Sequence, residues 1–499
     1  MNWKWNFVIN VLGKGGAVLV AFLFTPVFVR MMGLEAYSLV ALFITFLSLT
    51  FVLDFALGAT MTRELARYSV EPGKGNEARD LARSLEHLYL WVGIAIAALG
   101  YFAAPWITTH WLNLQALSYD SVRNSVSLMA IAIGLQVPLG MYVGGMYGLD
   151  RQPTLNLAQF LLSVLRYGGA VVAMLLFGAT AEVFFSWQLG FSALQTLTMR
   201  TLLWRNLPRG DRGARFSVEA LRGTLHFTSR VAGTAVASLI LNQLDRIVLS
   251  RLMPLTVLGS YQIGGQLGNA TRLLSTLVES VVMPRMVVHA TRGDNSGLRE
   301  LYHESCQMVA LITLPMAAAV VFFSEPLIAL WIGDANIAAA AALPASLLTL
   351  GSALNALVRV PAGLTLAKGW AAFGLWESII SGILFVPLLI VLIQFYGAVG
   401  AASAWVILNA GYVLIDTPII HKRMLPGEMK SWLAWSAITP VLIAFGLFGA
   451  LRLALPVFAP LQEFLIVAAA WVVVSMACAQ AMPHTRALLN RTLSYLIRR

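Results

Sequence analysis

Residues 226–285 read HFTSRVAGTAVASLILNQLDRIVLSRLMPLTVLGSYQIGGQLGNATRLLSTLVESVVMPR. Most of this stretch is apolar, yet polar side chains recur every three or four residues in both of its halves. These positions are Arg230, Thr234, Ser238, Asn242 and Asp245, followed by Gln262, Gln266, Asn269, Arg272, Thr276 and Glu279. Because helical geometry stacks such positions on one face, the stretch predicts two long apolar helices that each carry a polar stripe. Such a pair is typical of the walls of a water-filled cavity inside a membrane.

The composition of the whole chain agrees with a membrane environment. Of its 499 residues, 59% are hydrophobic and only 11% are charged, whereas an average soluble domain carries about 25% charged residues. We therefore expect a polytopic membrane protein. Its two cysteines, Cys306 and Cys478, both lie in apolar runs, which excludes a disulfide framework and a cysteine metal site.

Apolar runs of about 20 residues predict membrane-spanning helices. The chain holds fourteen such runs, near residues 6–29, 37–60, 84–107, 124–147, 154–177, 182–204, 226–251, 258–283, 304–324, 340–364, 373–395, 397–420, 433–453 and 462–482. The predicted fold is all-α, with about 14 transmembrane helices and both chain ends on the same side. The first run is long and is interrupted by Lys14, so we expect a retained helix rather than a cleaved signal peptide.

The positions of the basic residues predict the orientation. Most of the 34 Lys and Arg residues fall in alternate connections, above all in segments 63–83, 200–222 and 285–299. The opposite connections hold only Arg30, Arg123, Arg251 and Arg452. The positive-inside rule then places the N- and C-termini in the cytoplasm. It also accounts for the net charge of +11 without nucleic acid. The longest outward connection, 108–123, is too short for a catalytic domain.

An internal repeat predicts how the helices are grouped. A shift of 221 residues places residues 30–32 on 251–253, and Pro105 on Pro326. Each of the two tripeptides forms a short outward turn between helices, so we expect two six-helix lobes of the same orientation, related by an axis along the membrane normal. The predicted divisions are an N-lobe at 1–205, a basic cytoplasmic linker at 206–225, a C-lobe at 226–425, and helices 13–14 with a basic C-terminal tail at 426–499.

Several motifs resemble those of the polysaccharide-transporter (Wzx-type) flippases. They are Asn242-Gln243-Leu244-Asp245-Arg246 through Gly259-Ser260-Tyr261, then Pro284-Arg285, Gly293-Asp294, Pro315 and Leu330-Trp331-Ile332-Gly333-Asp334, with Arg30 to Tyr37 in the first lobe. The likeness covers about residues 1–425. It implies translocation of a lipid-linked oligosaccharide from the inner to the outer leaflet of a bacterial inner membrane. It also implies membership of a superfamily with multidrug antiporters and peptidoglycan-precursor flippases.

Six basic residues lie inside the predicted helices, where a charge near the bilayer centre costs roughly 3 kcal/mol. They are Lys14, Arg166, Arg230, Arg246, Arg272 and Arg359. Arg272 and Arg166 lie nearest mid-depth and are predicted to be cavity cations for a phosphate group. The alternatives are a buried ion pair for Arg272 and a hydrogen-bonded seam between the lobes for Arg166. The other four lie nearer the helix ends, where snorkelling can account for them. Of these, Lys14, Arg359 and Arg230 remain substrate-binding candidates.

Acidic residues inside the helices are candidates for ion pairs or for a coupling proton. Asp54, Glu279, Glu377 and Asp416 fall toward the cytoplasmic ends of their predicted helices. Asp245 belongs to the motif shared with the flippases and can hold the outer gate of its lobe.

These features predict a flippase that moves a polyprenyl-diphosphate-linked oligosaccharide across the bacterial inner membrane by alternating access, for surface or exopolysaccharide assembly. Arginine suits that substrate because it contacts phosphate through two hydrogen bonds at once. The expected partners are this lipid-linked oligosaccharide and membrane lipids, with a polysaccharide polymerase and chain-length proteins as further candidates. No nucleic acid, cofactor, metal or catalytic residue is expected.

Four other functions make different predictions. A peptidoglycan-precursor (lipid II) flippase has fourteen helices, whereas many Wzx-type members have twelve, but its expected arginine-bearing first-helix motif is not found here. A multidrug antiporter requires deep acidic sites, and the deep charges here are basic. A membrane glycosyltransferase or polysaccharide polymerase requires a sizeable outward loop with acidic or histidine residues. A structural scaffold leaves the buried arginines unexplained.

Overall fold

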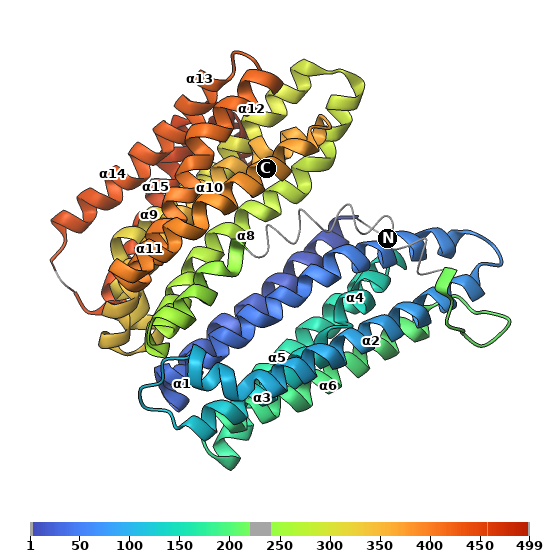
Figure 1. Ribbon diagram of the computed structural model, residues 1–499. Helices are drawn as coiled ribbons and strands as arrows, with labels where there is room; N and C mark the ends of the chain where they lie inside the picture. Colours follow the sequence, from blue (N-terminus) through green and yellow to red (C-terminus); the bar gives the residue numbers. More distant parts are fainter. Residues whose placement is uncertain (1–2, 220–240, 457, 498–499) are drawn as a thin grey trace. The chain divides into compact units, whose positions relative to one another are not determined.

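A computed structural model describes residues 3–219, 241–456 and 458–497 (Figure 1). The side chains of 3–15, 17–18, 51–57, 371 and 491–497 are not part of that description. Within the described ranges the regular structure is helical, apart from one isolated bridge between Asn113 and Pro254. The predicted all-α class is therefore confirmed.

The chain forms two compact units, Met1–Gly259 and Ser260–Arg499. The named helices of the first unit are α1 (Trp3–Val70), α2 (Gly75–Trp106), η1 (Ile107–Trp111), α3 (Tyr119–Gln136), α4 (Leu139–Gly148), α5 (Gln152–Phe177) and α6 (Ala181–Asn206). Residues 241–252 are also helical. The predicted division into lobes with a linker at 206–225 stays a prediction.

The long helix α1 is a hairpin of two helical arms. Its backbone leaves the helical region at Gly33, where φ is 81° and ψ is 165°. The Phe28 ring lies 5.2 Å from that of Phe184, and the Phe43 ring lies 5.8 Å from that of Phe185. A straight helix would separate positions 28 and 43 by about 22 Å, so the chain must reverse between them. Gly33 tolerates the positive φ because it has no Cβ.

The turn at residues 250–256 is hydrogen-bonded to the connection that follows α2. Trp111 Nε1 donates to Ser250 Oγ at 2.9 Å, and Asn113 Nδ2 donates to the Arg251 carbonyl at 3.1 Å. Thr256 Oγ1 donates to Gln115 Oε1 at 2.9 Å. These bonds give the turn a fixed place on the first unit and explain why that unit extends to residue 259.

The second unit contains the remaining helices. They are α8 (Leu255–Arg292), whose first residues belong to the first unit, α9 (Asn295–Ile332), α10 (Ala335–Ala367), α11 (Ala371–Gly411), η2 (Tyr412–Asp416), α12 (Thr417–Met424), α13 (Met429–Trp432), η3 (Leu433–Ile438), α14 (Thr439–Ala454), α15 (Pro460–Ala481) and α16 (Pro483–Ile497). Like α1, α11 reverses at a glycine, Gly397 (φ 57°). A Cβ at position 400 would collide with the Leu392 carbonyl, eight residues back along the chain.

Ten helical stretches of the described chain are long and apolar enough to span a membrane. The α1 and α11 stretches each contain a reversal, so each matches two of the predicted runs. Helix α6 is not among the ten, and the run at 226–251 is described only from residue 241. The fourteen predicted runs are thus accounted for. The orientation of the termini stays a prediction.

Candidate functional site

Arg166 is the predicted cavity cation of the first unit. It lies half-buried on α5. Its Nε donates to Gln188 Oε1 on α6 at 2.7 Å, and its carbonyl accepts a hydrogen bond from Trp187 Nε1 at 2.9 Å. The guanidinium carbon lies 5.6 Å from the centre of the Phe43 ring and 5.7 Å from that of Phe191. These contacts fix the orientation of the guanidinium without neutralising its charge.

Among the side chains that the structure describes, Arg166 has no carboxylate partner. Aromatic faces attract a guanidinium by about 0.5–2 kcal/mol each, which is less than the cost of removing a charge from water. An anion that reached the remaining N–H groups would therefore bind favourably. This is the geometry expected of a binding residue, although the side chains of Lys14 and Asp54 lie outside the described set.

In the second unit, Arg359 and Glu279 form an ion pair between α10 and α8. Arg359 Nη1 lies 2.5 Å from Glu279 Oε2, and the two side chains are 28% and 31% exposed. Arg359 Nε is buried and has no hydrogen-bond partner among the described residues. Both residues were singled out from the sequence, as a snorkelling cation and as an acid near a helix end. They lie 80 positions apart in the chain, and the sequence does not pair them.

Arg272 lies on the same helix as Glu279, two turns earlier, and is half-buried. Its carbonyl accepts hydrogen bonds from the hydroxyls of Ser275, at 2.8 Å, and Thr276, at 2.9 Å. Its role as a phosphate-binding cation stays a prediction.

Glu377 and Asp416 line one cavity of about 380 Å³ in the second unit, between α11 and η2. The hydroxyls of Ser381 and Tyr412 line it as well. Neither carboxylate has an ion-pair partner among the described residues. Two acids and two hydroxyls around one apolar-walled cavity could hold a proton or a small cation.

Two further predicted residues, Asp54 and Lys14, belong to α1, but their side chains are outside the described set. A third, Arg230, falls in the range 220–240, which is not described at all. Asp245 lies half-buried in the helical residues 241–252. The described candidates therefore lie in four places: around Arg166, at the Glu279–Arg359 pair with Arg272 on the same helix as Glu279, at the Glu377 cavity, and at Asp245.

Sequence reasoning missed Gln188 and Trp187, which orient Arg166. A signal was present, because Gln188 is a polar residue inside the apolar run 182–204. Asn409 was also missed, and its side chain accepts a hydrogen bond from Asn355 at 2.8 Å. Isolated amides in apolar helices could have been paired as candidates, but no periodicity identifies their partners.

The chain is similar to solved structures of a flippase and of transporters. The lipid II flippase MurJ, in an inward closed conformation, matches with a TM-score of 0.74 at 15% identity, covering 95% of this chain and 98% of that one. An inward-facing multidrug resistance MATE family transporter of the MOP superfamily matches with a TM-score of 0.65 at 13% identity, covering 83% and 96%. At such identities the likeness concerns the fold.

A third similar structure is a MOP superfamily transporter from Pyrococcus furiosus, in which reverse polarity of the binding pocket suggests a different function. It matches with a TM-score of 0.53 at 17% identity, covering 84% of this chain and 94% of that one. A comparison with curated protein sequences gives no match.

The sequence itself matches one family model. The model describes a polysaccharide biosynthesis protein and aligns with residues 27–340, which include α2 to α6, α8 and α9 and the candidates Arg166, Arg272 and Glu279. The fold is that of the flippase and the transporters to which the chain is similar. Because the match extends over well over half of its residues, the chain belongs to the polysaccharide biosynthesis protein family.

Proposed function

We propose that the chain is a flippase that carries a polyprenyl-diphosphate-linked oligosaccharide from the inner to the outer leaflet of the bacterial inner membrane. Family membership supports a role in polysaccharide assembly, and the fold likeness to lipid II flippase MurJ supports a lipid-linked substrate. The observation that carries the proposal is Arg166, a half-buried guanidinium without a carboxylate partner among the described side chains.

A diphosphate is the part of this substrate that Arg166 would bind. A guanidinium has five N–H donors, and Arg166 gives its Nε–H to Gln188. The two Nη groups therefore remain to form the paired hydrogen bonds with which arginine recognises phosphate. Because Gln188 and the Phe43 and Phe191 rings already hold the guanidinium, little conformational entropy is lost when phosphate binds.

The Glu377 and Asp416 cavity supports a coupling role. Transport against a gradient needs a second ligand whose binding favours one conformation over the other. Two carboxylates without an ion-pair partner among the described residues can take up and release a proton or a small cation. In this proposal they couple an ion gradient to alternating access.

Reconstitution into liposomes tests the assignment of Arg166. The assay follows a fluorescent polyprenyl-diphosphate oligosaccharide until it becomes accessible to a glycosidase outside the vesicle. Hydrogen bonds to charged groups contribute about 1.5–3 kcal/mol, so Arg166→Ala should slow transport by about tenfold to a hundredfold. Arg166→Lys should restore only part of the rate, because an ammonium cannot make the paired contact.

Arg123→Ala is the matched control. Its side chain is 40% exposed and pairs with Asp120 at 3.3 Å, so its loss removes one charge without touching the proposed site. Equal transport by the Arg166→Ala and Arg123→Ala proteins, at equal amounts of folded protein, would refute the assignment.

A peptidoglycan precursor is the second candidate substrate, favoured by the likeness to lipid II flippase MurJ over 95% of this chain. The same vesicles loaded with lipid II separate the two possibilities. Transport of lipid II but not of the oligosaccharide diphosphate lipid would establish the precursor as the substrate. Efflux of a cationic dye with neither lipid moved would instead favour a multidrug antiporter, as in the MATE relatives.

A further inference from the structure

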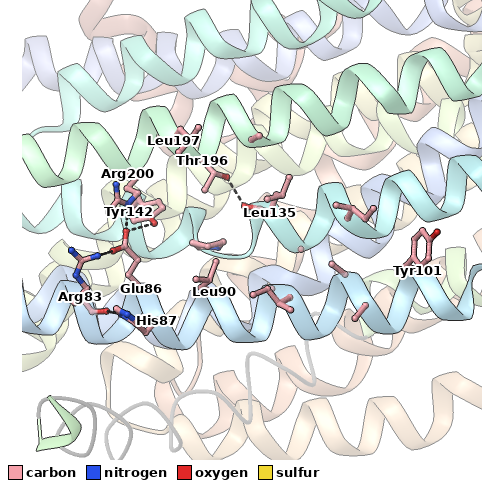
Figure 2. A pocket seen from close by; sticks show the side chains of 18 residues that line it. Arg83, Glu86, His87, Leu90, Tyr101, Leu135, Tyr142, Thr196, Leu197 and Arg200 are labelled. Atoms are coloured by element: carbon pink, nitrogen blue, oxygen red, sulfur yellow. Dashed lines mark hydrogen bonds and ion pairs between the residues drawn. The ribbon is translucent and has the colours of Figure 1, made fainter. Parts of the chain in front are cut away.

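A second candidate site lies in the first unit, and Arg166 is not among its lining residues. It is a groove of about 830 Å³ between α2, α3 and α6, which α4 closes on one side (Figure 2). We call it the α2–α6 groove. Its charged side chains gather at one end, around Arg83 and Arg200, and Tyr101 lies at the other end (Figure 2). The lining between these ends is mainly apolar, with Leu90 and Ile94 among its members.

The charged end has a surplus of positive charge. Glu86 accepts contacts from Arg200 Nε at 2.5 Å, Arg83 Nη1 at 3.1 Å and the Tyr142 hydroxyl at 2.9 Å. Two guanidinium groups thus share one carboxylate, which leaves one positive charge without compensation among the residues that line the groove. The Arg83 and Arg200 side chains are 36% and 41% exposed, so their unused N–H groups are accessible to a ligand.

The cluster is also held rigidly. The guanidinium carbons of Arg83 and Arg200 lie 5.0 and 5.9 Å from the centre of the Trp204 ring. His87 Nδ1 lies 2.7 Å from the Arg83 carbonyl oxygen. In the neutral tautomer that donates this hydrogen bond, the other ring nitrogen, Nε2, is an acceptor. Arginines that are fixed by a ring and a shared carboxylate form a preorganised site for an anion, with phosphate the best geometric match.

The length of the groove selects among phosphate lipids. Along α2, Arg83 and Tyr101 are 18 positions apart, which corresponds to about 27 Å. The hydrocarbon core of a bilayer is about 30 Å thick, so one leaflet supplies about 15 Å. A phospholipid chain anchored at Arg83 would fill roughly the first half of the groove, whereas a longer chain can follow it to Tyr101.

We propose that the α2–α6 groove binds a long-chain isoprenoid phosphate, with the phosphate at Arg83 and Arg200 and the chain along the apolar wall. Only the class of lipid is taken from the proposed function. Since lipid tails already lie in an apolar solvent, chain burial adds little affinity by itself. The phosphate contacts therefore contribute most of the affinity, and packing of the chain in the deep half of the groove contributes the preference for a long chain.

The test measures binding to the full chain in nanodiscs by native mass spectrometry. The probes are a long-chain polyprenyl phosphate, geranyl phosphate and dioleoyl phosphatidic acid. Arg83→Gln should weaken binding of all three by about tenfold or more, because one charged hydrogen-bonding group is lost. Arg205→Gln, which removes an exposed charge from α6 outside the groove, should leave binding unchanged.

A second variant tests the chain. Ala98 lines the deep half of the groove, 15 positions beyond Arg83, whereas the neighbouring exposed Ala95 does not line it. Ala98→Phe should weaken binding of the long-chain probe by at least fivefold. Binding of geranyl phosphate should not change, because its chain is too short to reach position 98. Ala95→Phe is the matched control and should spare both probes.

Equal affinity of wild-type protein for phosphatidic acid and the long-chain probe would overturn the proposal, because the site would then be one for membrane phospholipid. An unchanged long-chain affinity in the Ala98→Phe protein would overturn it as well. The two proposals fail separately. If Arg166→Ala loses transport but no lipid binds at Arg83, only the proposed lipid site in the groove is refuted. If lipid binds at Arg83 but the chain transports nothing, only the proposed flippase function is refuted.

Discussion

Replacing Glu279 with Gln should destabilise the second unit, because it leaves the Arg359 guanidinium without its carboxylate. The two groups are 2.5 Å apart, with side chains 28% and 31% exposed, so most of each lies out of water. Two unit charges about 4 Å apart attract by about 4 kcal/mol at an effective dielectric constant of 20. Desolvation and solvent screening reduce the net coupling to about 1–2 kcal/mol.

A double-mutant cycle measures this coupling. The three variants are Glu279→Gln, Arg359→Gln and the two together. In units of this size, 1 kcal/mol shifts the melting temperature by about 2–4 °C. Each single variant should therefore melt about 2–8 °C lower in detergent, followed by tryptophan fluorescence. The double variant should regain most of the loss, because it leaves no unpaired charge. Strictly additive losses would refute the reasoning.

The same cycle has a transport readout. If Arg359 serves only as the partner of Glu279, the double variant should transport at close to the wild-type rate. If Arg359 binds the substrate phosphate, stability should return while transport does not. The cycle thus separates the ion pair with Glu279 that the structure shows from the substrate-binding role predicted for Arg359 from the sequence.

Three further perturbations have defined outcomes. Glu35→Ala should lower the melting temperature and speed amide exchange at 115–117, because the buried Glu35 carboxylate accepts all three N–H groups at 2.6–3.1 Å and charge-assisted bonds contribute about 1.5–3 kcal/mol each; unchanged exchange would contradict this. Gly33→Ala should lower the free energy of unfolding by about 1–2 kcal/mol, because a residue with a Cβ is strained at a φ of 81°. Gly190→Ala, in a helix with open space around it, should instead raise the melting temperature. Equal shifts in the two variants would argue against strain at Gly33. Asp294→Ala should destabilise the start of α9 near neutral pH, because hydrogen bonds from the Gly297 N–H and from its side-chain neighbours hold the Asp294 pKa at about 2. A lowered folded-state pKa stabilises above the unfolded value of about 3.9, so the deficit should vanish as the pH falls from about 4 to about 2.

Much of the fold could be predicted because a membrane leaves few alternatives. Each apolar run of the described chain is helical, since backbone groups in hydrocarbon must be satisfied within the segment. The ends of the helices were harder to predict than their existence. The run at 84–107 is only part of α2, which begins at Gly75. Its first turns carry charged residues such as Glu77 and Asp80, and an apolar criterion cannot detect a helix that continues beyond its apolar run.

The candidate site could be predicted only in part, because partners depend on helix register. Arg166 could be singled out because it lies near the middle of its predicted helix. Its hydrogen bond to Gln188, 22 positions away, depends on how α5 packs on α6. The sequence pattern assigns Arg83 and Arg200 only to two separate basic segments, 63–83 and 200–222. Their convergence on Glu86 requires α2 and α6 both to pack on α3, which no local pattern specifies.

Under the proposed function, phosphate binding and ion coupling belong to different units. In the described part of the first unit, Arg166 is a half-buried cation without a carboxylate, whereas in the second unit Glu377 and Asp416 share a cavity without a cation. If the substrate phosphate binds the former and a coupling proton the latter, each can be removed alone. Arg166→Ala should then lower the transport rate at every pH gradient by one factor, because each cycle still takes up its proton. Glu377→Gln should abolish the dependence on the gradient while substrate binding to the detergent-solubilised protein persists. A Glu377→Gln protein that still responds to the gradient would place the coupling elsewhere.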